Sequence, residues 1–203
     1  VIVSTSPKAK IPGSYFFDFS PENGYMTAKA IVMMAVENFK NRNPKRVLIP
    51  GEPVPLMSGF SNEAIKGALG GSFKPLIDLI AAGKIRVAAG IVGCNNPHVQ
   101  HDYGHVTLAK ELIKRNILCV ETGCAAIASG KAGLLRPEAA ALAGDDLRAV
   151  CESLKIPPVL HMGSCVDNSR ILVLAAELGN ALNVPIHKLP IAGAAPEWYS
   201  QKA

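Results

Sequence analysis

Short apolar runs alternate with amphipathic stretches along most of this chain. Buried parallel strands read as continuous apolar runs, and the crossovers between them are usually helices. The alternation therefore predicts a parallel sheet covered on both faces. We classify the fold as α/β, a doubly wound, Rossmann-like sheet with helices on both sides. The expected strands are residues 45–50, 85–93, 117–123, 157–163 and 186–193, and the expected helices between them are 61–70, 73–83, 105–116, 124–133, 136–144, 147–154 and 168–182.

The first 24 residues differ from the rest, because they are rich in proline, glycine and aromatic residues. We expect residues 1–24 to form a linker or interdomain edge. The stretch "SPEN" resembles the cap and first turn of a helix over 24–41. Residues 25–203 are then expected to form the Rossmann-like domain. The chain begins at Val1 and stops after "SQKA" with no helix-ending signal, so it is expected to belong to a longer polypeptide.

Composition narrows the class of protein. The 203 residues are 49% hydrophobic and 18% charged, which suits a folded core. A net charge of +5 without a basic stripe, and only 5% aromatic residues, argue against nucleic-acid binding. No apolar run is long enough for a membrane span, and no signal peptide is evident, so a cytoplasmic location is expected. Five cysteines without a secretion signal indicate reduced thiols rather than a disulfide framework.

Nucleotide-binding loops do not fit the sequence. "GCAAIASGKAG" contains a Gly-Lys pair, but its glycine spacing is too long for a Walker loop, and Ala132 stands where a Mg²⁺-binding hydroxyl belongs. "GALGGS" lies between helices rather than directly after a strand, so it is not a dinucleotide fingerprint.

Three cysteines stand where an expected strand turns into a helix. Cys94, Cys124 and Cys165 each fall at the carboxyl end of a strand, where ligands collect in open parallel sheets. Since neighbouring strands lie about 4.8 Å apart, the three could surround one iron–sulfur cluster, which needs thiolates. Spacings of 30 and 41 residues match no short metal motif, so topology alone leaves ordinary buried cysteines equally open. Cys119 and Cys151 lie in apolar periodic patterns and are interpreted as core residues.

The motifs around these cysteines carry a family likeness. "VGCNNP", "TGCAAIASGKAGLL", "IPPVLHMGSCVDNSRI" and "APEWYSQKA", in that order, resemble the C-terminal Rossmann-like region of nickel-containing anaerobic carbon monoxide dehydrogenases. The resemblance implies a nickel–iron–sulfur cluster that interconverts CO and water with CO₂, two protons and two electrons. It also implies that Cys94 and Cys124 bind cluster irons, that Cys165 binds nickel, and that Lys202 is the active-site lysine. The cluster-binding domain would then be residues 25–203.

The same resemblance sets expectations for the rest of the protein. Members are several times longer, and their 4Fe-4S relay clusters, one cluster histidine and further cysteines have no counterpart here. We therefore expect this segment alone to be inactive. The resemblance implies a ferredoxin-type electron carrier and a homodimer, and it leaves open whether an acetyl-CoA synthase partner is present. Gln201 stands where the family usually has an acidic residue.

The histidines are not assigned to the metal. His98, His101 and His105 fall on the opening turns of a helix, where capping or surface roles are common. His161 is expected to be packed and hydrogen-bonded within a strand.

Two alternatives remain open. One is the related hybrid-cluster reductase, which acts on nitrogen oxides or hydroxylamine. The other is a non-catalytic α/β interaction domain, for which the apolar, aromatic N-terminal edge would serve as the interface.

Overall fold

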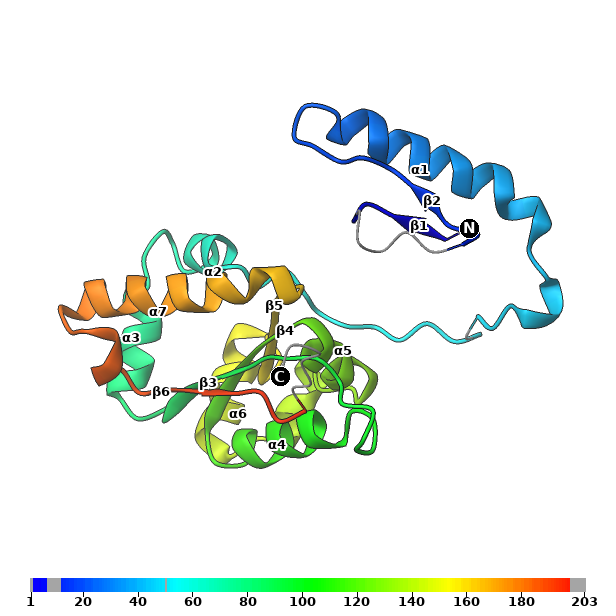
Figure 1. Ribbon diagram of the computed structural model, residues 1–203. Coiled ribbons are helices and arrows are strands. Elements are labelled where there is room, and N and C mark those ends of the chain that lie inside the picture. Colours follow the sequence, from blue (N-terminus) through cyan, green and yellow to red (C-terminus); the bar gives the residue numbers. More distant parts are fainter. Residues whose placement is uncertain (1, 7–11, 50, 198–203) are drawn as a thin grey trace. The chain divides into compact units, whose positions relative to one another are not determined.

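A four-stranded parallel sheet forms the centre of the larger part of the molecule (Figure 1). The computed structural model describes residues 2–6, 12–49 and 51–197. Within them the strand order is β5-β4-β3-β6, and every neighbouring pair is parallel. The predicted α/β class is thus confirmed. The strands are β3 (Val87–Ile91), β4 (Ile117–Thr122), β5 (Val159–Gly163) and β6 (Ile191–Ala194).

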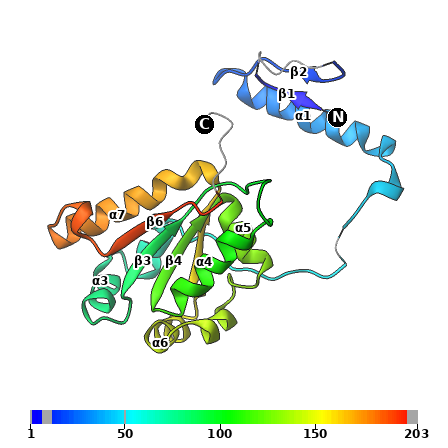
Figure 2. The same ribbon diagram turned by 60° about the horizontal axis from the view of Figure 1, so that its bottom comes forward.

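Helices cover both faces of this sheet. The chain runs outward from β3 through β4 to β5, then returns to place β6 on the other side of β3. Because parallel crossovers are right-handed, this reversal places the last crossover helix on the opposite face from the earlier ones. Figure 2 shows α4 and α5 on one side of the sheet and α7 on the other. The helices are α2 (Asn62–Ala68), α3 (Lys74–Ala81), α4 (Tyr103–Ile113), α5 (Gly123–Lys131), α6 (Asp145–Leu154) and α7 (Asn168–Leu182).

Each face has its own apolar core. On one face, Ile113 of α4, Ala125 of α5 and Leu147 of α6 are fully buried with strand residues. On the other face, Leu174 and Leu178 of α7 pack in a second cluster with Phe73, Val120 and Met162. Apolar stripes on the helices therefore hold them against the sheet, which leaves the strand ends free to carry polar and thiol groups.

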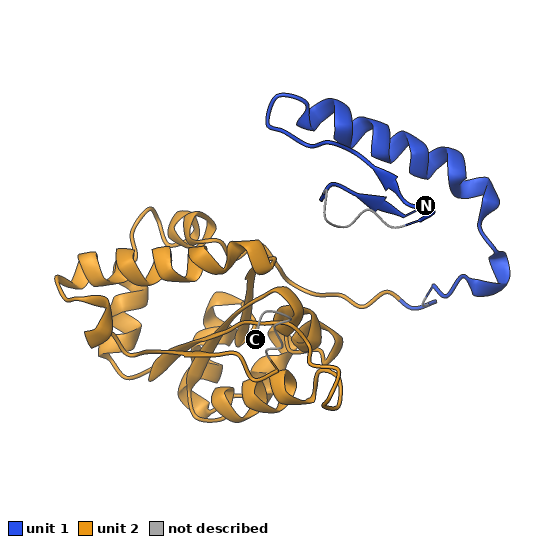
Figure 3. Ribbon diagram, viewed as in Figure 1, with its two compact units in different colours: residues 1–52 blue, residues 53–203 orange. Residues whose placement is uncertain are grey.

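The chain divides into two compact units, residues 1–52 and 53–203 (Figure 3). The first contains the parallel pair β1 (Val3–Ser4) and β2 (Tyr15–Phe16), then α1 (Gly24–Asn38). A hydroxyl hydrogen bond from Thr27 to the Asp18 carbonyl, at 3.4 Å, links α1 to the segment before it. This division differs from the sequence-based boundary after residue 24, since it groups α1 with residues 1–52.

The predicted strand 45–50 is absent from its described residues, and the predicted strand 186–193 is present only in its last part. Residues 44–46 form a 3-10 helix, and no strand follows in 47–49, where Leu48 is 92% exposed. An apolar run forms a strand only when another strand lies beside it to share backbone hydrogen bonds, and residues 47–49 have no such neighbour among the described residues. The last strand begins only at Ile191, because Pro190 lacks the N–H that a ladder requires and a 3-10 helix precedes it at Ile186–Lys188. In the described part of the chain, no helix is both long and apolar enough to cross a membrane.

Candidate metal centre at the carboxyl edge of the sheet

Three cysteines follow three adjacent strands at one edge of the sheet. Cys94 comes shortly after β3, Cys124 is the second residue of α5 directly after β4, and Cys165 opens a 3-10 helix after β5. Since β3, β4 and β5 are parallel neighbours, their carboxyl ends lie at the same edge. Cys94 and Cys165 are exposed and Cys124 is half-buried. The predicted placement of these cysteines at strand ends is therefore confirmed.

The other two cysteines belong to the core, as predicted. Cys119 on β4 and Cys151 on α6 are 0% and 1% exposed. Burial raises the pKa of the Cys151 thiol to about 11, and it raises that of Cys119 further. Neither thiol is thus suited to form the thiolate that a metal requires.

Gly123 allows the Cys124 and Cys165 loops to touch. Its φ is +58°, and a Cβ built on it would lie 3.1 Å from the Cβ and 3.3 Å from the backbone N of Cys165. That separation is tighter than nearly all real Cβ contacts, and the atoms it would meet are mostly backbone. A side chain at this position would therefore push the two loops apart.

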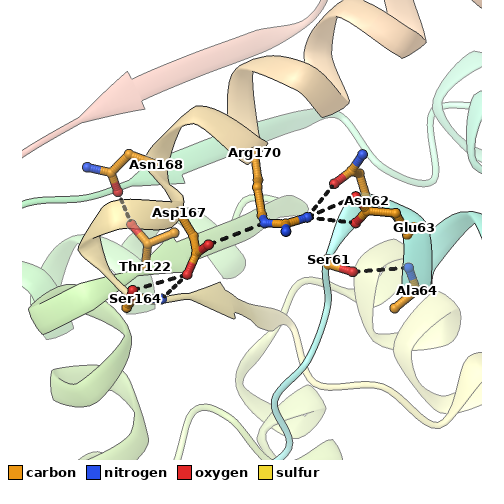
Figure 4. Close-up of polar contacts among 9 residues, drawn as sticks. All are labelled: Ser61, Asn62, Glu63, Ala64, Thr122, Ser164, Asp167, Asn168 and Arg170. Carbon is orange, nitrogen blue, oxygen red and sulfur yellow. Dashed lines mark hydrogen bonds and ion pairs between the residues drawn. The ribbon is translucent and has the colours of Figure 1, made fainter. Parts of the chain in front are cut away.

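The Cys165 loop is shaped by its own polar residues (Figure 4). The backbone N–H of Ser164 donates to Asp167 Oδ2 at 2.8 Å, and the Ser164 hydroxyl is 3.1 Å from the same oxygen. The bond from the Ser164 N–H is one half of a capping box around the 3-10 helix Cys165–Asp167, and in the other half the Ser164 side chain accepts from the backbone N–H of Asp167. The backbone and hydroxyl bonds from Ser164 hold the pKa of the Asp167 carboxyl below its ordinary value, with a smaller contribution from Arg170. The capping box fixes the backbone that carries the Cys165 thiol.

Arg170 ties this loop to α2. Its Nε donates to Asp167 Oδ1 at 3.2 Å, and its Nη1 donates to both oxygens of Glu63 at 2.9 and 2.8 Å. Glu63 lies in the first turn of α2, a helix that the Ser61 hydroxyl caps by accepting from the Ala64 N–H. Figure 4 shows the arginine lying between the two carboxylates. Two segments far apart in the sequence are thus joined beside Cys165.

Thr122 joins the Cys165 loop to the end of β4. Its hydroxyl donates to Asn168 Oδ1, and Thr122 is fully buried. Thr122 directly precedes Gly123 and Cys124, whereas Asn168 begins α7. The bond therefore fixes the two cysteine junctions relative to each other.

The loop that carries Cys94 is held by buried groups instead. Gly93 adopts a φ of +108°, and the carbonyl of Cys94 lies 3.4 Å from Nε2 of His105. His105 is fully buried, so the expectation of a capping or surface role is wrong for this histidine. Asn95 donates through Nδ2 to Asp102 Oδ1 at 2.9 Å, and Asp102 is ion-paired with Lys131.

His161 was expected to be packed and hydrogen-bonded within a strand. It lies on β5, where its carbonyl accepts from the N–H groups of Gly59 and Phe60 at 3.2 and 3.1 Å. Its Nδ1 has no hydrogen-bond partner among the described residues, and burial lowers its pKa. The main chain at this position is therefore hydrogen-bonded, but that ring nitrogen is not.

The donor set at this edge suits an iron–sulfur cluster better than a single ion. In the described residues, no three His, Cys, Asp or Glu side chains are grouped closely enough to hold one metal ion. A cluster spreads its ligands over several ångströms and takes thiolates, which soft metals prefer. Three cysteines outside the core at one edge, with two of their loops in contact through Gly123, fit such a group.

Lys202 and Gln201 lie outside the described residues. Sequence reasoning also missed the residues that hold the cysteine loops, among them Arg170, Glu63 and Asp102. Capping signals such as "SCVD" could have suggested the capping box, but no local pattern pairs Arg170 with Glu63.

Comparison with known proteins gives a consistent result. The family model described as "Prismane/CO dehydrogenase family" matches residues 1–203. Carbon monoxide dehydrogenase 1 of Methanosarcina acetivorans is 63% identical over 99% of this chain. A nickel-free crystal structure of carbon monoxide dehydrogenase from Thermococcus sp. AM4 has 53% identity and a TM-score of 0.88 over 98% of this chain. A structure of acetyl-CoA synthase/carbon monoxide dehydrogenase with NiZn[Fe4S4] and NiNi[Fe4S4] clusters has 37% identity and a TM-score of 0.86. The chain spans 32% of the length of each of these three proteins.

Proposed function

Because the chain belongs to the Prismane/CO dehydrogenase family, we propose that it is part of a nickel–iron–sulfur carbon monoxide dehydrogenase. The reaction would convert CO and water to CO₂, two protons and two electrons. One observation carries the proposal, namely the three cysteines at adjacent strand ends within a chain that matches the family throughout. The residues 25–203 assigned to the cluster-binding domain contain all three.

Each cysteine has a proposed role. Cys94 and Cys124 would bind irons of the cluster, and Cys165 would bind the nickel. When bound, the cluster supplies a soft, thiolate-ligated nickel for CO, an iron that acidifies water, and a store for the electrons. The side chains of this chain hold the thiols in place. Asp167 and Arg170 fix the Cys165 loop, and the Thr122–Asn168 hydrogen bond keeps it beside the Cys124 junction.

Lys202 would be the catalytic lysine. Its ammonium group would donate a hydrogen bond to the oxygen that gains negative charge as the carboxylate forms, a preorganised interaction that stabilises the transition state. The support for this role is the match of "APEWYSQKA" to the family motif.

The remaining assignments concern the whole protein. We propose a cytoplasmic, anaerobic homodimer that passes electrons through 4Fe-4S relay clusters, outside this segment, to a ferredoxin-type carrier. A similar structure contains an acetyl-CoA synthase, which favours such a partner for some members. CO, CO₂ and water would be the small-molecule substrates.

The test uses the intact protein prepared without oxygen. We expect it to contain nickel and iron and to reduce methyl viologen when CO is added. The 203-residue chain alone is expected to do neither, because three cysteines cannot complete the coordination of the cluster. Nickel in stoichiometric amount and CO-dependent reduction with the short chain would contradict that expectation.

Other results would favour the alternatives. An iron-containing intact protein that reduces hydroxylamine but does not oxidise CO would indicate a hybrid-cluster reductase. An intact protein without nickel or iron after anaerobic reconstitution would favour a non-catalytic interaction domain.

A further inference from the structure

A buried carboxylate lies between the Cys94 loop and the start of α4. Glu197, three residues after the end of β6, is only 2% exposed. Its Oε1 accepts hydrogen bonds from the N–H groups of Gly104 and His105, at 2.6 and 3.3 Å. Its Oε2 accepts from Asn95 Nδ2 at 3.1 Å, and Asn95 directly follows Cys94. One side chain therefore joins the start of a helix to the residue beside a candidate metal ligand.

Asn95 is the point at which the Cys94 loop is held. This loop covers residues 92–102, between β3 and α4, and it forms no helix or strand. A side-chain amide carries two N–H hydrogens, so Nδ2 of Asn95 can donate both to Glu197 and to Asp102 Oδ1, which lies 2.9 Å away. Because the loop is irregular, side-chain bonds of this kind decide where its backbone lies.

The cap of α4 shows what Glu197 adds. Asp102 is the N-cap residue of α4, but it makes no side-chain cap bond and its φ is +67°. An aspartate at this position commonly accepts hydrogen bonds from the first N–H groups of its own helix. Here its carboxylate faces Asn95, and the N–H groups of Gly104 and His105 donate to Glu197 at the positive end of the helix dipole. A carboxylate in the loop itself could cap α4 without burial, so the distinctive contact of Glu197 is the one that reaches the Cys94 loop.

Glu197 is held as an anion in a tight space. Burial alone would raise its pKa, but hydrogen bonds from Asn95, Gly104 and His105 outweigh the burial and hold the pKa below its ordinary value. A Cβ built on Gly104 would lie 3.0 Å from Glu197 Cγ, so the absence of a side chain there lets the carboxylate reach the helix. Hydrogen bonds to a charged acceptor are stronger than those to a neutral one. The link from Glu197 to Asn95 is thus charge-assisted and shielded from solvent.

We propose that Glu197 is a positioning residue for the iron site of Cys94: through Asn95, it fixes the loop that presents this thiol to the cluster. The proposal rests on the proposed function, in which Cys94 binds a cluster iron. The Cys94 side chain is exposed, so packing does not hold it in place, and the bond at the next residue does. Buried charges add little net stability, but they can specify one arrangement of the chain. A preorganised site needs its ligands held within about 0.5 Å.

Glu197→Gln separates the two contacts of this side chain. Glutamine has the same size but only one oxygen. We expect that oxygen to accept from the two N–H groups of α4, which leaves the glutamine NH₂ group facing Asn95 Nδ2, a donor against a donor. The variant therefore breaks the link to the loop and keeps the helix cap. Glu152→Gln is the matched control, because Glu152 is an exposed carboxylate on α6.

The first readout does not depend on the metal. In the metal-free intact protein, hydrogen exchange of a peptide covering residues 92–102 should quicken about fivefold or more in Glu197→Gln. That peptide contains the N–H groups of Val92 and Val99, which donate to backbone carbonyls at 2.9 and 3.3 Å. Exchange in α4, and exchange throughout Glu152→Gln, should stay at the wild-type rate. Unchanged exchange in the loop would overturn the proposal, and so would faster exchange confined to α4, because Glu197 would then be only a helix cap.

A double-mutant cycle with Asn95→Ala tests the route. If Glu197 acts through Asn95, Glu197→Gln will quicken exchange of the loop hardly further in the Asn95→Ala background. The same fold-change in both backgrounds would overturn the proposal. If Glu197→Gln does not fold, Asn95→Ala breaks the same link from the other side. Wild-type exchange of the loop in Asn95→Ala would then overturn the proposal.

The second readout concerns the cluster. In the intact protein prepared without oxygen, we expect Glu197→Gln to lose iron to a chelator about 5- to 10-fold faster than the wild type, and the electron paramagnetic resonance spectrum of the cluster to change. Glu152→Gln should show neither effect. Iron loss at the wild-type rate, or an unchanged spectrum, would overturn the proposal. A wild-type protein that binds no nickel or iron would instead reject the proposed function, and the exchange experiment would still show whether Glu197 holds the loop.

Discussion

The Cys94 and Cys165 loops occupy equivalent places in the sheet but are held by different means. His105 and Glu197, which hold the Cys94 loop, are 0% and 2% exposed. The Cys165 loop is held by Asp167, Arg170 and Glu63, whose side chains are 32%, 41% and 66% exposed. The Cys94 loop is thus fixed mainly by interior hydrogen bonds, with the Asp102–Lys131 ion pair beside it, whereas the Cys165 loop is fixed mainly by ion pairs in contact with solvent.

This difference predicts how each loop responds to change. Exposed ion pairs contribute little to the stability of the fold and are screened by salt. A buried carboxylate that loses its hydrogen-bond partners, in contrast, strongly destabilises the fold. The loop proposed to bind nickel should therefore be the more easily loosened of the two. The close contact with Gly123 and the hydrogen bond from buried Thr122 to Asn168 are the exceptions, because neither is an ion pair in contact with solvent.

Gly123→Ala should give the largest loss of stability, nickel and CO oxidation. The new Cβ meets Cys165 and the positive φ strains the backbone, so we expect about 1–3 kcal/mol of lost stability in the 203-residue chain. In the intact protein, we expect nickel loss and about 100-fold lower CO oxidation. Hydrogen exchange around Cys94 should stay unchanged, since the substitution acts on the Cys165 side.

Gly193→Ala is the control for this substitution. Gly193 lies on β6 of the same sheet, and a Cβ there would meet nothing within 4 Å. The control should retain nickel and activity. Equal behaviour of the two variants would mean that the contact between the cysteine loops has no bearing on the site.

Glu121→Gln tests how burial changes the pKa of a carboxyl group that accepts no hydrogen bond of ordinary geometry from the described residues. Glu121 on β4 is fully buried like Glu197, but none of the described residues donates a hydrogen bond of ordinary geometry to either oxygen. Burial raises its pKa to about 8, although the nearby Ser129 hydroxyl lowers it slightly. The folded state therefore binds a proton that the unfolded state releases above its ordinary pKa of 4.5.

The sign of the pH effect follows from this difference. The stabilising contribution of Glu121 is full below about pH 4.5 and is lost as the pH rises through about 8. The free energy of unfolding, measured with urea on the 203-residue chain, should fall over that range by up to about 1.4 kcal/mol per pH unit. Glu121→Gln should remove this slope. Identical pH profiles for the two chains would show that Glu121 is not buried as a neutral acid.

The sequence predicted the edge of the sheet that carries Cys94, Cys124 and Cys165, because the patterns that mark this edge are local. Each of β3, β4 and β5 is an apolar run followed within a few residues by a glycine and a cysteine, and periodicity is sufficient to locate such junctions, as at β4 and Cys124. The same rule failed at residues 47–49, because an apolar run becomes a strand only when a neighbouring strand is present. The assignments of nickel to Cys165 and of a catalytic role to Lys202 came from resemblance and not from any pattern.

The bonds that hold the loops could not be predicted in this way. Asn95 and Glu197 are 102 residues apart in the sequence, and Arg170 and Glu63 are 107 apart. No periodicity pairs side chains at such distances, because the fold alone brings them together. The single acidic residue in the apolar stretch "IAGAAPEW" was the one available signal for Glu197.

Arg170→Ala should give the smallest change in nickel binding and CO oxidation. The change removes the link between Asp167 and Glu63, but the capping box of Ser164 and Asp167 remains. In the intact protein we therefore expect nickel to dissociate only a few times faster in the presence of a chelator, with CO oxidation largely retained. Raising the salt concentration should speed nickel loss in the wild type toward the rate of the variant, because solvent ions screen the same pairs.

Arg115→Ala is the matched control, since Arg115 makes an exposed ion pair with Glu111 on α4 at 2.7 Å and touches neither cysteine loop. It should not alter nickel dissociation. A loss of nickel in Arg170→Ala as large as in Gly123→Ala would contradict the comparison, because it would show that the exposed ion pairs hold the Cys165 loop as firmly as the backbone contact. Salt-independent nickel loss in the wild type would lead to the same conclusion, since pairs that resist screening behave as buried ones.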